Sequence, residues 1–308
     1  MTQVFAWQVC ARLGVPLEVV PLSKEYWSRV VVRSISQIKR GYTPNPDVLC
    51  NSEVKFGAFY DFLEKHSDSF DRIASGHYAG LVRDANQQLV KLAVTTDAIK
   101  DQTYFLARLE QQQLAKAMFP LGRLDKSIVR ELARIAGLPT QFRKDSQGIC
   151  FLGKVKFNEF VKEHLGEWPG PLLEEETGQH LGLHKGYWFH TIGQRTGLGL
   201  AGGPWYVVRK DIDWNVVFIS QNYSALEENR GSFRCTSVNW ISGPPEPDKQ
   251  LYCKVRHGPH SYACELVVDE RGHGTVTIHG RDQGLAVGQY AVFYQDMICL
   301  GCAVIDWV

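Results

Sequence analysis

Cys50 stands in a sequence context that favours a reactive thiolate. It follows a loop stiffened by Pro44 and Pro46, and a helical pattern begins just after it. A helix N-terminus carries partial positive charge and lowers the pKa of a thiol, and Asn51 or Ser52 is a suitable N-cap. Cys50 is therefore a candidate nucleophile, although a plain turn that ends in a small buried cysteine fits the same pattern.

Cys150 is a second candidate thiol. It lies in a polar, glycine-containing stretch in which Arg143 and Lys144 closely precede it. Neighbouring cations stabilise a thiolate, whereas the competing interpretation is a surface loop that ends in a buried cysteine. Neither cysteine decides the chemistry by itself.

The elements that must position these thiols alternate between helical and extended patterns in the first half of the chain, which is typical of an α/β fold. The predicted elements are a strand over residues 16–22, a helix over 24–40, a helix after Cys50 that includes 56–63, a buried strand over 72–77, and helices over 102–116 and 125–137. The strand over 72–77 runs into a turn at Gly76, and ligands of such sheets bind at the carboxyl ends of strands.

Short extended runs and glycine-rich turns dominate after about residue 160. From residue 232 onward, closely spaced strand patterns predict a small antiparallel β-barrel. Its expected strands cover residues 252–256, 263–268, 274–278, 289–294 and 300–305. We therefore expect three modules, which span residues 1–155, 156–230 and 231–308.

Composition and charge indicate an ordinary globular protein. The 308 residues are 44% hydrophobic and carry a formal net charge of +1, so RNA contact would need local patches such as Arg29, Arg33, Lys39 and Arg40. The 8 cysteines are too thinly spread for a disulfide framework. With no long apolar run and no signal-peptide pattern at the start, we expect a bacterial cytoplasm or an organelle matrix rather than secretion.

The motifs taken together closely resemble those of the tRNA-specific 2-thiouridylases. The matching stretches surround Cys50 and Cys150 and include residues 73–79, 100–106, 119–122, 190–195, 204–208, 291–294 and 299–301. The resemblance covers nearly the whole chain from about residue 8. It implies an adenine-nucleotide α-hydrolase-like (Rossmann-like) α/β domain, a small central domain and a C-terminal antiparallel β-barrel that helps to hold tRNA, in a monomer.

The resemblance also implies a reaction and a set of site residues. ATP, with Mg, would adenylate the wobble uridine of tRNA, a sulfur donor would load a persulfide on Cys150, and Cys50 would complete the transfer. A Cys50–Cys150 disulfide would then need a reductant. Asp47 is the implied general acid or base, with an Asx-turn as the alternative, and Gly76 the implied nucleotide contact. The implied tRNA contacts are Asn45, Pro46, Asp47, His77, Lys100, Asp101, Gln102, Arg256, His257 and Gln289.

The phosphate-binding loop of the family, S-G-G-V-D-S, does not occur in these 308 residues. Such loops hold the ATP pyrophosphate through backbone N–H groups at a helix N-terminus, so ATP binding by this chain is in question. We expect an N-terminally truncated α/β domain whose sheet edge lacks a strand. The alternatives are a non-catalytic tRNA-binding remnant and a sulfur-relay protein that accepts a persulfide on Cys150.

Two further cysteine groups suggest metal or redox chemistry, and we interpret both as structural. The CxxC pair of Cys299 and Cys302 has no second pair beside it and lies in a strand pattern. The possible zinc ligands Cys253, His257, His260 and Cys264 lie in a predicted hairpin that turns at 257–260. No structural metal is expected.

Overall fold

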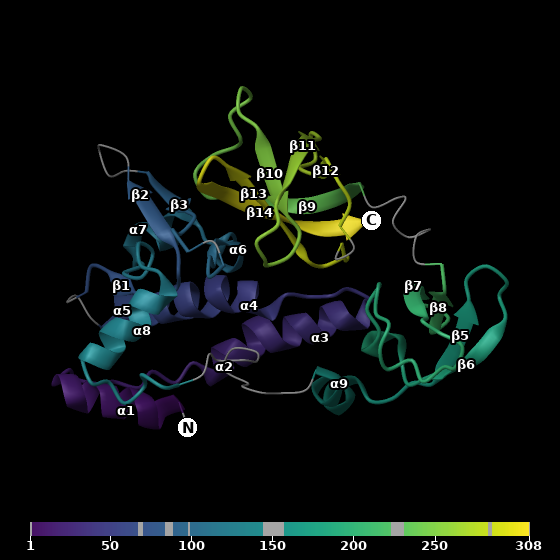
Figure 1. The fold of residues 1–308 in the computed structure, drawn as a ribbon, viewed down its shortest axis with the longest axis horizontal. Coiled ribbons are helices and arrows are strands. Elements are labelled where there is room, and N and C mark those ends of the chain that lie inside the picture. Colours follow the sequence, from purple (N-terminus) through teal and green to yellow (C-terminus); the bar gives the residue numbers. More distant parts are fainter. Residues whose placement is uncertain are drawn as a thin grey trace.

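The computed structural model describes residues 2–66, 70–83, 89–97, 99–143, 157–222, 231–282 and 285–307 (Figure 1). Figure 1 shows the C-terminal barrel lying over a layer of helices that includes α3 and α4. The central sheet lies at one end of this layer, and α1 and α8 lie at the other. None of the described helices is both long and apolar enough to cross a membrane.

The first helices form the lower layer. Helix α1 spans Thr2–Leu13, and α2 (Ser23–Tyr26), a π-helical turn (Trp27–Val31) and α3 (Val32–Lys39) follow one another without a break. The helix predicted over 24–40 is confirmed. The strand predicted over 16–22 is wrong, because this stretch is irregular and pairs with no described strand; a strand needs a neighbour for its backbone groups.

A second continuous helix carries Cys50. It consists of α4 (Pro46–Leu49), a π-helical segment (Cys50–Ala58) and α5 (Phe59–His66). Its apolar residues divide between two cores: Val48, Phe56 and Tyr60 face the α/β core, whereas Leu49, Cys50 and Val54 face the core shared with α3 and the central domain. The helix therefore lies between two packed regions.

The remaining α/β elements surround a short parallel pair. Strand β1 (Ile73–Ala74) pairs in parallel with β4 (Ala117–Met118). Helices α6 (Thr103–Leu106) and α7 (Gln111–Lys116) replace the single helix predicted over 102–116. Helix α8 (Lys126–Ile135) is as predicted, and the chain leaves it through Gly137 at φ 59°, a conformation that glycine adopts without strain.

The central domain contains α9 (Phe157–Leu165), a 3-10 turn (Tyr187–Phe189) and four described strands. The strands are β5 (Gly170–Glu174), β6 (His180–His184), β7 (Tyr206–Asp211) and β8 (Val216–Ser220), in the order β6-β5-β8-β7. Strands β5 and β8 are parallel, and the other pairs are antiparallel. Leu172, Val207 and Val217 of this sheet pack against Val30 and Ile38 of the α2–α3 helix.

The C-terminal barrel is closed and antiparallel, as predicted. Its strands are β9 (Ser232–Trp240), β10 (Leu251–Lys254), β11 (Tyr262–Val268), β12 (Gly274–Ile278), β13 (Tyr290–Gln295) and β14 (Ile298–Trp307). Each pairs with two neighbours, and the β13–β14 and β10–β13 pairings close the ring.

A hairpin from the α/β region extends the barrel sheet. Strands β2 (Gly80–Arg83) and β3 (Val90–Ala93) pair with each other, and Leu92 and Ala93 lie opposite Cys299 and Ile298 of β14. Figure 1 shows this hairpin beside the barrel. The sequence did not predict this pairing, which joins the first module to the third.

Candidate functional site

Asn45 is the N-cap of the helix that carries Cys50. Its side-chain oxygen accepts a hydrogen bond from the backbone N–H of Val48 at 3.3 Å, and Pro46 occupies the first helical position. The prediction that Asn51 or Ser52 caps this helix is wrong. Cys50 lies beyond the first turn, so the partial charge of the helix end is not directed at its thiol as the sequence suggested.

Cys50 is fully buried. It is 0% exposed and packs in the core that contains Leu49, Val54 and Tyr26. Asp47 lies half-buried in the first turn of the same helix. Cys150 and Lys144 lie outside the described residues, so the pairing of Cys50 with Cys150 stays a prediction.

Gln289 of the barrel holds the loop that leads into this helix. Its side-chain nitrogen donates to the backbone oxygens of Thr43 at 2.8 Å and Pro44 at 3.2 Å. Its side-chain oxygen accepts from the Asn45 amide at 3.2 Å. The structure therefore brings together two predicted site residues, Asn45 and Gln289, that are far apart in the sequence.

Asp101 forms a second buried attachment to the barrel. It is only 4% exposed, and its carboxylate accepts hydrogen bonds from the Thr95 N–H at 3.3 Å and the Thr103 hydroxyl at 2.7 Å. Lys254 of β10 lies 3.9 Å from the same carboxylate and 5.3 Å from the centre of the Tyr294 ring. This position gives Asp101 a structural role, and its contact with RNA stays a prediction.

His257 continues this attachment at the barrel turn. Its Nε2 donates to the Asp101 backbone oxygen at 3.1 Å, and its ring stacks on Phe105 with centroids 4.7 Å apart. The Phe105 backbone oxygen in turn accepts from Asn51 on the Cys50 helix at 2.9 Å. Arg256, beside it, forms an ion pair with buried Asp282 at 3.3 Å and remains largely exposed.

His77, which follows strand β1, is buried. Its Nδ1 lies 2.8 Å from the Ser75 hydroxyl, and its ring packs against Phe56 and Phe119. Burial, and to a smaller extent the positive charge of Lys55, lowers its pKa to about 3. His77 is thus neutral near pH 7, and it offers a tRNA phosphate no positive charge.

Gln102 and Lys100 flank Asp101. Gln102 joins its loop to the segment after His77, because its side chain accepts from the Tyr78 N–H at 3.0 Å and its own N–H donates to the Tyr78 oxygen at 2.9 Å. The Lys100 backbone N–H is held by Asp97, and its side chain is half-buried. The predicted contacts at 77 and 100–102 therefore form one connected unit.

Gly76 lies in the turn after strand β1 and is exposed. A Cβ there would meet only Leu121 Cδ1, at 4.0 Å. The chain passes from β1 through 75–79 into strand β2, so this turn leads to no helix N-terminus of the kind that holds a triphosphate. The contact of Gly76 with a nucleotide stays a prediction.

The candidate zinc residues occupy two different environments. Cys253 and Cys264 are buried inside the barrel, and burial raises the pKa of the Cys253 thiol well above its ordinary value. His257 and His260 lie on the exposed turn. Within the described ranges, no three His, Cys, Asp or Glu side chains converge as a metal site.

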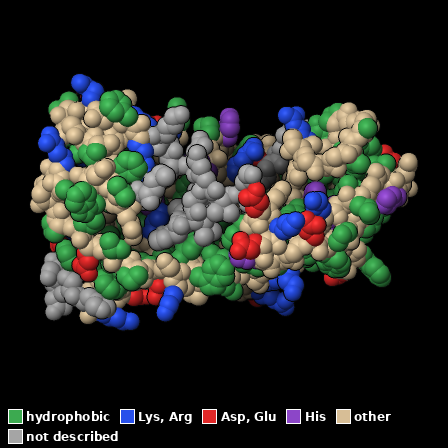
Figure 2. Space-filling view, turned by 90° about the horizontal axis from the view of Figure 1, so that it is seen from below, with side chains coloured by type: hydrophobic (Ala, Val, Ile, Leu, Met, Phe, Trp, Pro, Cys, Tyr) green, Lys and Arg blue, Asp and Glu red, His purple; other side chains and the backbone are tan. Residues whose placement is uncertain are grey.

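The predicted basic stripe is neutralised in part, at Arg29 and Arg33. Arg33 and Arg108 both contact the Glu53 carboxylate, and Arg29 pairs with Asp61 at 3.5 Å. Sequence reasoning missed Glu53 and Arg108, because ion pairs between distant residues leave no local pattern. Figure 2 shows acidic and basic side chains side by side on the face that it presents.

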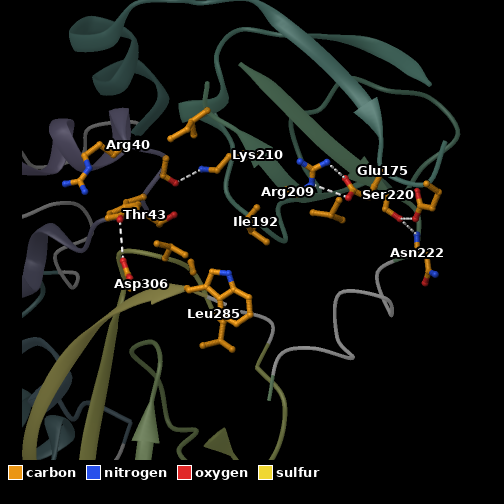
Figure 3. A pocket seen from close by; sticks show the side chains of 18 residues that line it. Arg40, Thr43, Glu175, Ile192, Arg209, Lys210, Ser220, Asn222, Leu285 and Asp306 are labelled. Carbon is orange, nitrogen blue, oxygen red and sulfur yellow. Dashed lines mark hydrogen bonds and ion pairs between the residues drawn. The ribbon is translucent and has the colours of Figure 1, made fainter. Parts of the chain in front are cut away.

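A cavity of about 730 Å³ lies where the three modules meet (Figure 3). The loop at 40–43, strand β7 and the barrel residues 285–287 contribute to its wall. Lys210 donates to the backbone oxygens of Gly41 and His190, and burial lowers its pKa to about 8. Arg40 of the predicted basic stripe lines this cavity, whereas none of the described catalytic, nucleotide-binding or tRNA-binding candidates does.

Comparison with known proteins identifies all three modules. Residues 3–154 match the domain described as "tRNA methyl transferase HUP domain", residues 158–221 the "tRNA methyl transferase PRC-barrel domain", and residues 230–305 the "Aminomethyltransferase beta-barrel domain". The fold and these matches define a protein with a HUP-type α/β domain, a small β domain and a C-terminal barrel. The predicted fold class is confirmed.

The curated relatives are named for thiolation. The chain is 44% identical over 299 residues to the tRNA-specific 2-thiouridylase MnmA 1 of Bacteroides thetaiotaomicron, across 95% of this chain and 83% of the relative. MnmA 2 of Bacteroides fragilis gives the same values. MnmA of Porphyromonas gingivalis is 43% identical over 307 residues, across 96% and 83%. The chain belongs to the tRNA-specific 2-thiouridylase family, as the motifs predicted.

Proposed function

We propose that this protein transfers sulfur to C2 of a uridine in tRNA, as the names of its relatives indicate for them. One structural observation supports the proposal in addition to the names of the relatives. The loop at 43–46, which leads to Cys50, and the loop at 100–105 are both attached to one barrel, through Gln289 and through Lys254 and His257. A base held between these loops would lie near the helix that carries Cys50.

The proposed transfer uses two thiols. The terminal sulfur of a Cys150 persulfide attacks C2 of the uridine, whose oxygen must first be made a leaving group by an activating co-substrate. The Cys50 thiolate then attacks the Cys150 sulfur, the bond to the transferred sulfur breaks, and a Cys50–Cys150 disulfide forms. A thiol reductant reopens the disulfide by exchange. The sulfur atom leaves with the base.

The proposal includes two requirements. Because Cys50 is fully buried, the groups that cover it must move before it reacts. ATP is the activating co-substrate that the family implies, and its phosphate-binding loop is not among these 308 residues. We therefore infer ATP-dependent activity only for a chain that includes such a loop.

Nucleoside analysis tests the proposal. The chain is expressed in bacteria that lack their own 2-thiouridylase, and 2-thiouridine in digested tRNA is measured by mass spectrometry. In a version of the chain that also carries the family's phosphate-binding loop, we expect product with the parent, none with Cys50→Ser or Cys150→Ser, and normal product with the matched control Cys10→Ser. Full product with either serine variant at position 50 or 150 would refute the assigned roles.

A non-catalytic tRNA-binding protein and a sulfur-relay protein are the two alternatives. A tRNA-binding protein without catalysis would bind tRNA with an affinity that falls steeply with salt and would form no 2-thiouridine. A sulfur-relay protein would load a persulfide on Cys150 without any dependence on RNA. Binding and persulfide assays on the same preparation separate the three functions.

A further inference from the structure

The Gln289 side chain is fully engaged as a hydrogen-bond donor. An amide group has two N–H donors and one carbonyl acceptor. Both Gln289 donors go to the backbone oxygens of Thr43 and Pro44, and its oxygen accepts from Asn45. The two carbonyl acceptors also fix which end of the amide faces the loop. Gln289 cannot donate to RNA without releasing the loop.

The backbone just before Gln289 lies against the same loop. The Thr43 N–H donates to the Val287 oxygen at 2.8 Å. Gly288 has φ 91°, and a Cβ there would lie 2.9 Å from the Tyr42 Cβ and 3.1 Å from the Thr43 nitrogen. Only glycine permits this approach. The contact between the barrel and the loop is therefore close and specific.

Asn45 transmits this contact to the helix. Its side-chain oxygen caps the helix at the Val48 N–H, while its side-chain nitrogen donates to Gln289. One side chain thus connects the barrel with the first turn, which contains Asp47 and leads to Cys50.

We propose that Gln289 is a positioning residue: it sets the conformation of the loop at 43–47 through Asn45. The inference deepens the proposed function, because it rests on this loop being the part that meets the target uridine. If Gln289 acts in this way, the loop at 43–47 has its correct conformation only when the barrel is docked against it.

Two substitutions each remove a different part of the contact between Gln289 and the loop. Gln289→Glu keeps the size and the acceptor for Asn45 but removes both donors to the loop. Asn45→Ser keeps a good N-cap but removes the amide that donates to Gln289. Gln295 provides the matched control, because it donates to the Glu246 and Lys249 oxygens and accepts from the Glu246 N–H in the same way. Gln295→Glu therefore makes the same chemical change at a loop of the barrel.

Hydrogen exchange followed by mass spectrometry on the full chain measures the loop directly. We expect exchange in a peptide covering 43–48 to rise roughly tenfold in Gln289→Glu, as the loss of about 1.4 kcal/mol of local stability would produce. Asn45→Ser should raise it in the same peptide, and the double variant should add little, since both act on one contact. Gln295→Glu should raise exchange only near 246–249. Unchanged exchange at 43–48 in both single variants would overturn the proposal.

Binding to two RNAs then tests whether Gln289 acts through Asn45. The probes are a tRNA with the target uridine and the same tRNA with cytidine at that position. Gln289→Glu should reduce the preference for uridine in the parent chain, and should reduce it no further in a chain that already carries Asn45→Ser. A reduction of the same size in both chains would show that Gln289 acts independently of Asn45 and would overturn the inference. A parent chain that binds neither tRNA would count against the proposed function alone, since the exchange comparison still decides the role of Gln289.

Discussion

The C-terminal barrel and the N-terminal α/β region satisfy their backbone hydrogen-bonding groups in different ways. Each barrel strand pairs with two other barrel strands, and interior residues such as Phe233, Val276 and Phe293 are at most 1% exposed. In the α/β region, the described parallel pairing is limited to β1 and β4. Helix α8 has no buried residue, although Leu132 and Ile135 lie on one face.

This difference shows that the α/β region relies on attachments to the barrel. The attachments are the β3–β14 pairing, the Asp101 cluster and the Gln289 contact. Predicted site residues occupy two of these three attachments. Figure 2 shows exposed hydrophobic side chains at the end of the molecule that carries α1 and α8, away from the barrel. Stability is thus concentrated at the barrel and at its contacts.

Removing a barrel core side chain should have the largest effect. Phe293→Ala leaves a cavity among fully buried neighbours, and we expect unfolding free energy to fall by about 3–5 kcal/mol. Chemical denaturation measures the change. Val267→Ala, on the exposed side of β11, is the control and should change stability by less than about 0.5 kcal/mol. Equal losses in both variants would contradict the assignment of inside and outside.

Weakening an attachment between the α/β region and the barrel should cause the second-largest loss of stability. Asp101→Asn leaves Lys254 facing an uncharged amide in a buried position, and we expect a loss of about 2–3 kcal/mol. The matched control is Asp296→Asn, because Asp296 is exposed at a turn with φ 51° that asparagine also adopts. If the two variants were equally stable in denaturation, the attachment would contribute nothing.

Acid should destabilise the α/β region through His77. Its pKa is lowered to about 3 in the folded protein from an ordinary 6.5, so the unfolded chain binds a proton that the folded chain excludes. Stability is present above about pH 6.5 and falls as pH decreases towards 3. We expect His77 to contribute about 2 kcal/mol of loss between pH 7 and pH 5.

The measurement compares stability against pH for the parent and His77→Gln, which should have the shallower curve. His190, whose pKa is lowered to about 4 mainly by burial, keeps part of the slope in both proteins. The two curves would run parallel if His77 were protonated in the folded state.

Truncating the exposed face of α8 should have the smallest effect. Leu132 is 51% exposed, and Leu132→Ala should change stability by less than about 0.5 kcal/mol, because little apolar surface is lost and alanine favours helices. Thermal unfolding checks this. A loss above about 1 kcal/mol would show that this face is packed, and the contrast with the barrel would then be weaker.

The barrel was predictable because its strands have local signals. Residues 274–278 alternate between buried and exposed positions, as a half-buried strand should. The β3–β14 pairing had no such signal, because β3 has only 4 residues and its partner lies more than 200 residues away in the chain. A local sequence pattern predicts a strand, but it does not predict which other strand pairs with it.

The residues of the candidate site could be named from the sequence, whereas their contacts with one another could not. Asn45, Asp101, His257 and Gln289 were named from motifs, yet their contacts with one another follow from the tertiary fold. The true start of the Cys50 helix did have a signal in Asn45 and Pro46, which suit an N-cap and a first helical position. The apolar periodicity begins only at Phe56, and it moved the predicted start too far along the chain.

The pairing of β3 with β14 also has a consequence for biosynthesis. Strand β14 (Ile298–Trp307) is synthesised more than 200 residues after the hairpin at 80–93. The hairpin must therefore wait for this stretch of chain before it gains its neighbour. Contacts between such distant residues slow folding and leave strand edges exposed in the meantime. The newly made α/β region should thus depend on chaperones until β14 has emerged from the ribosome.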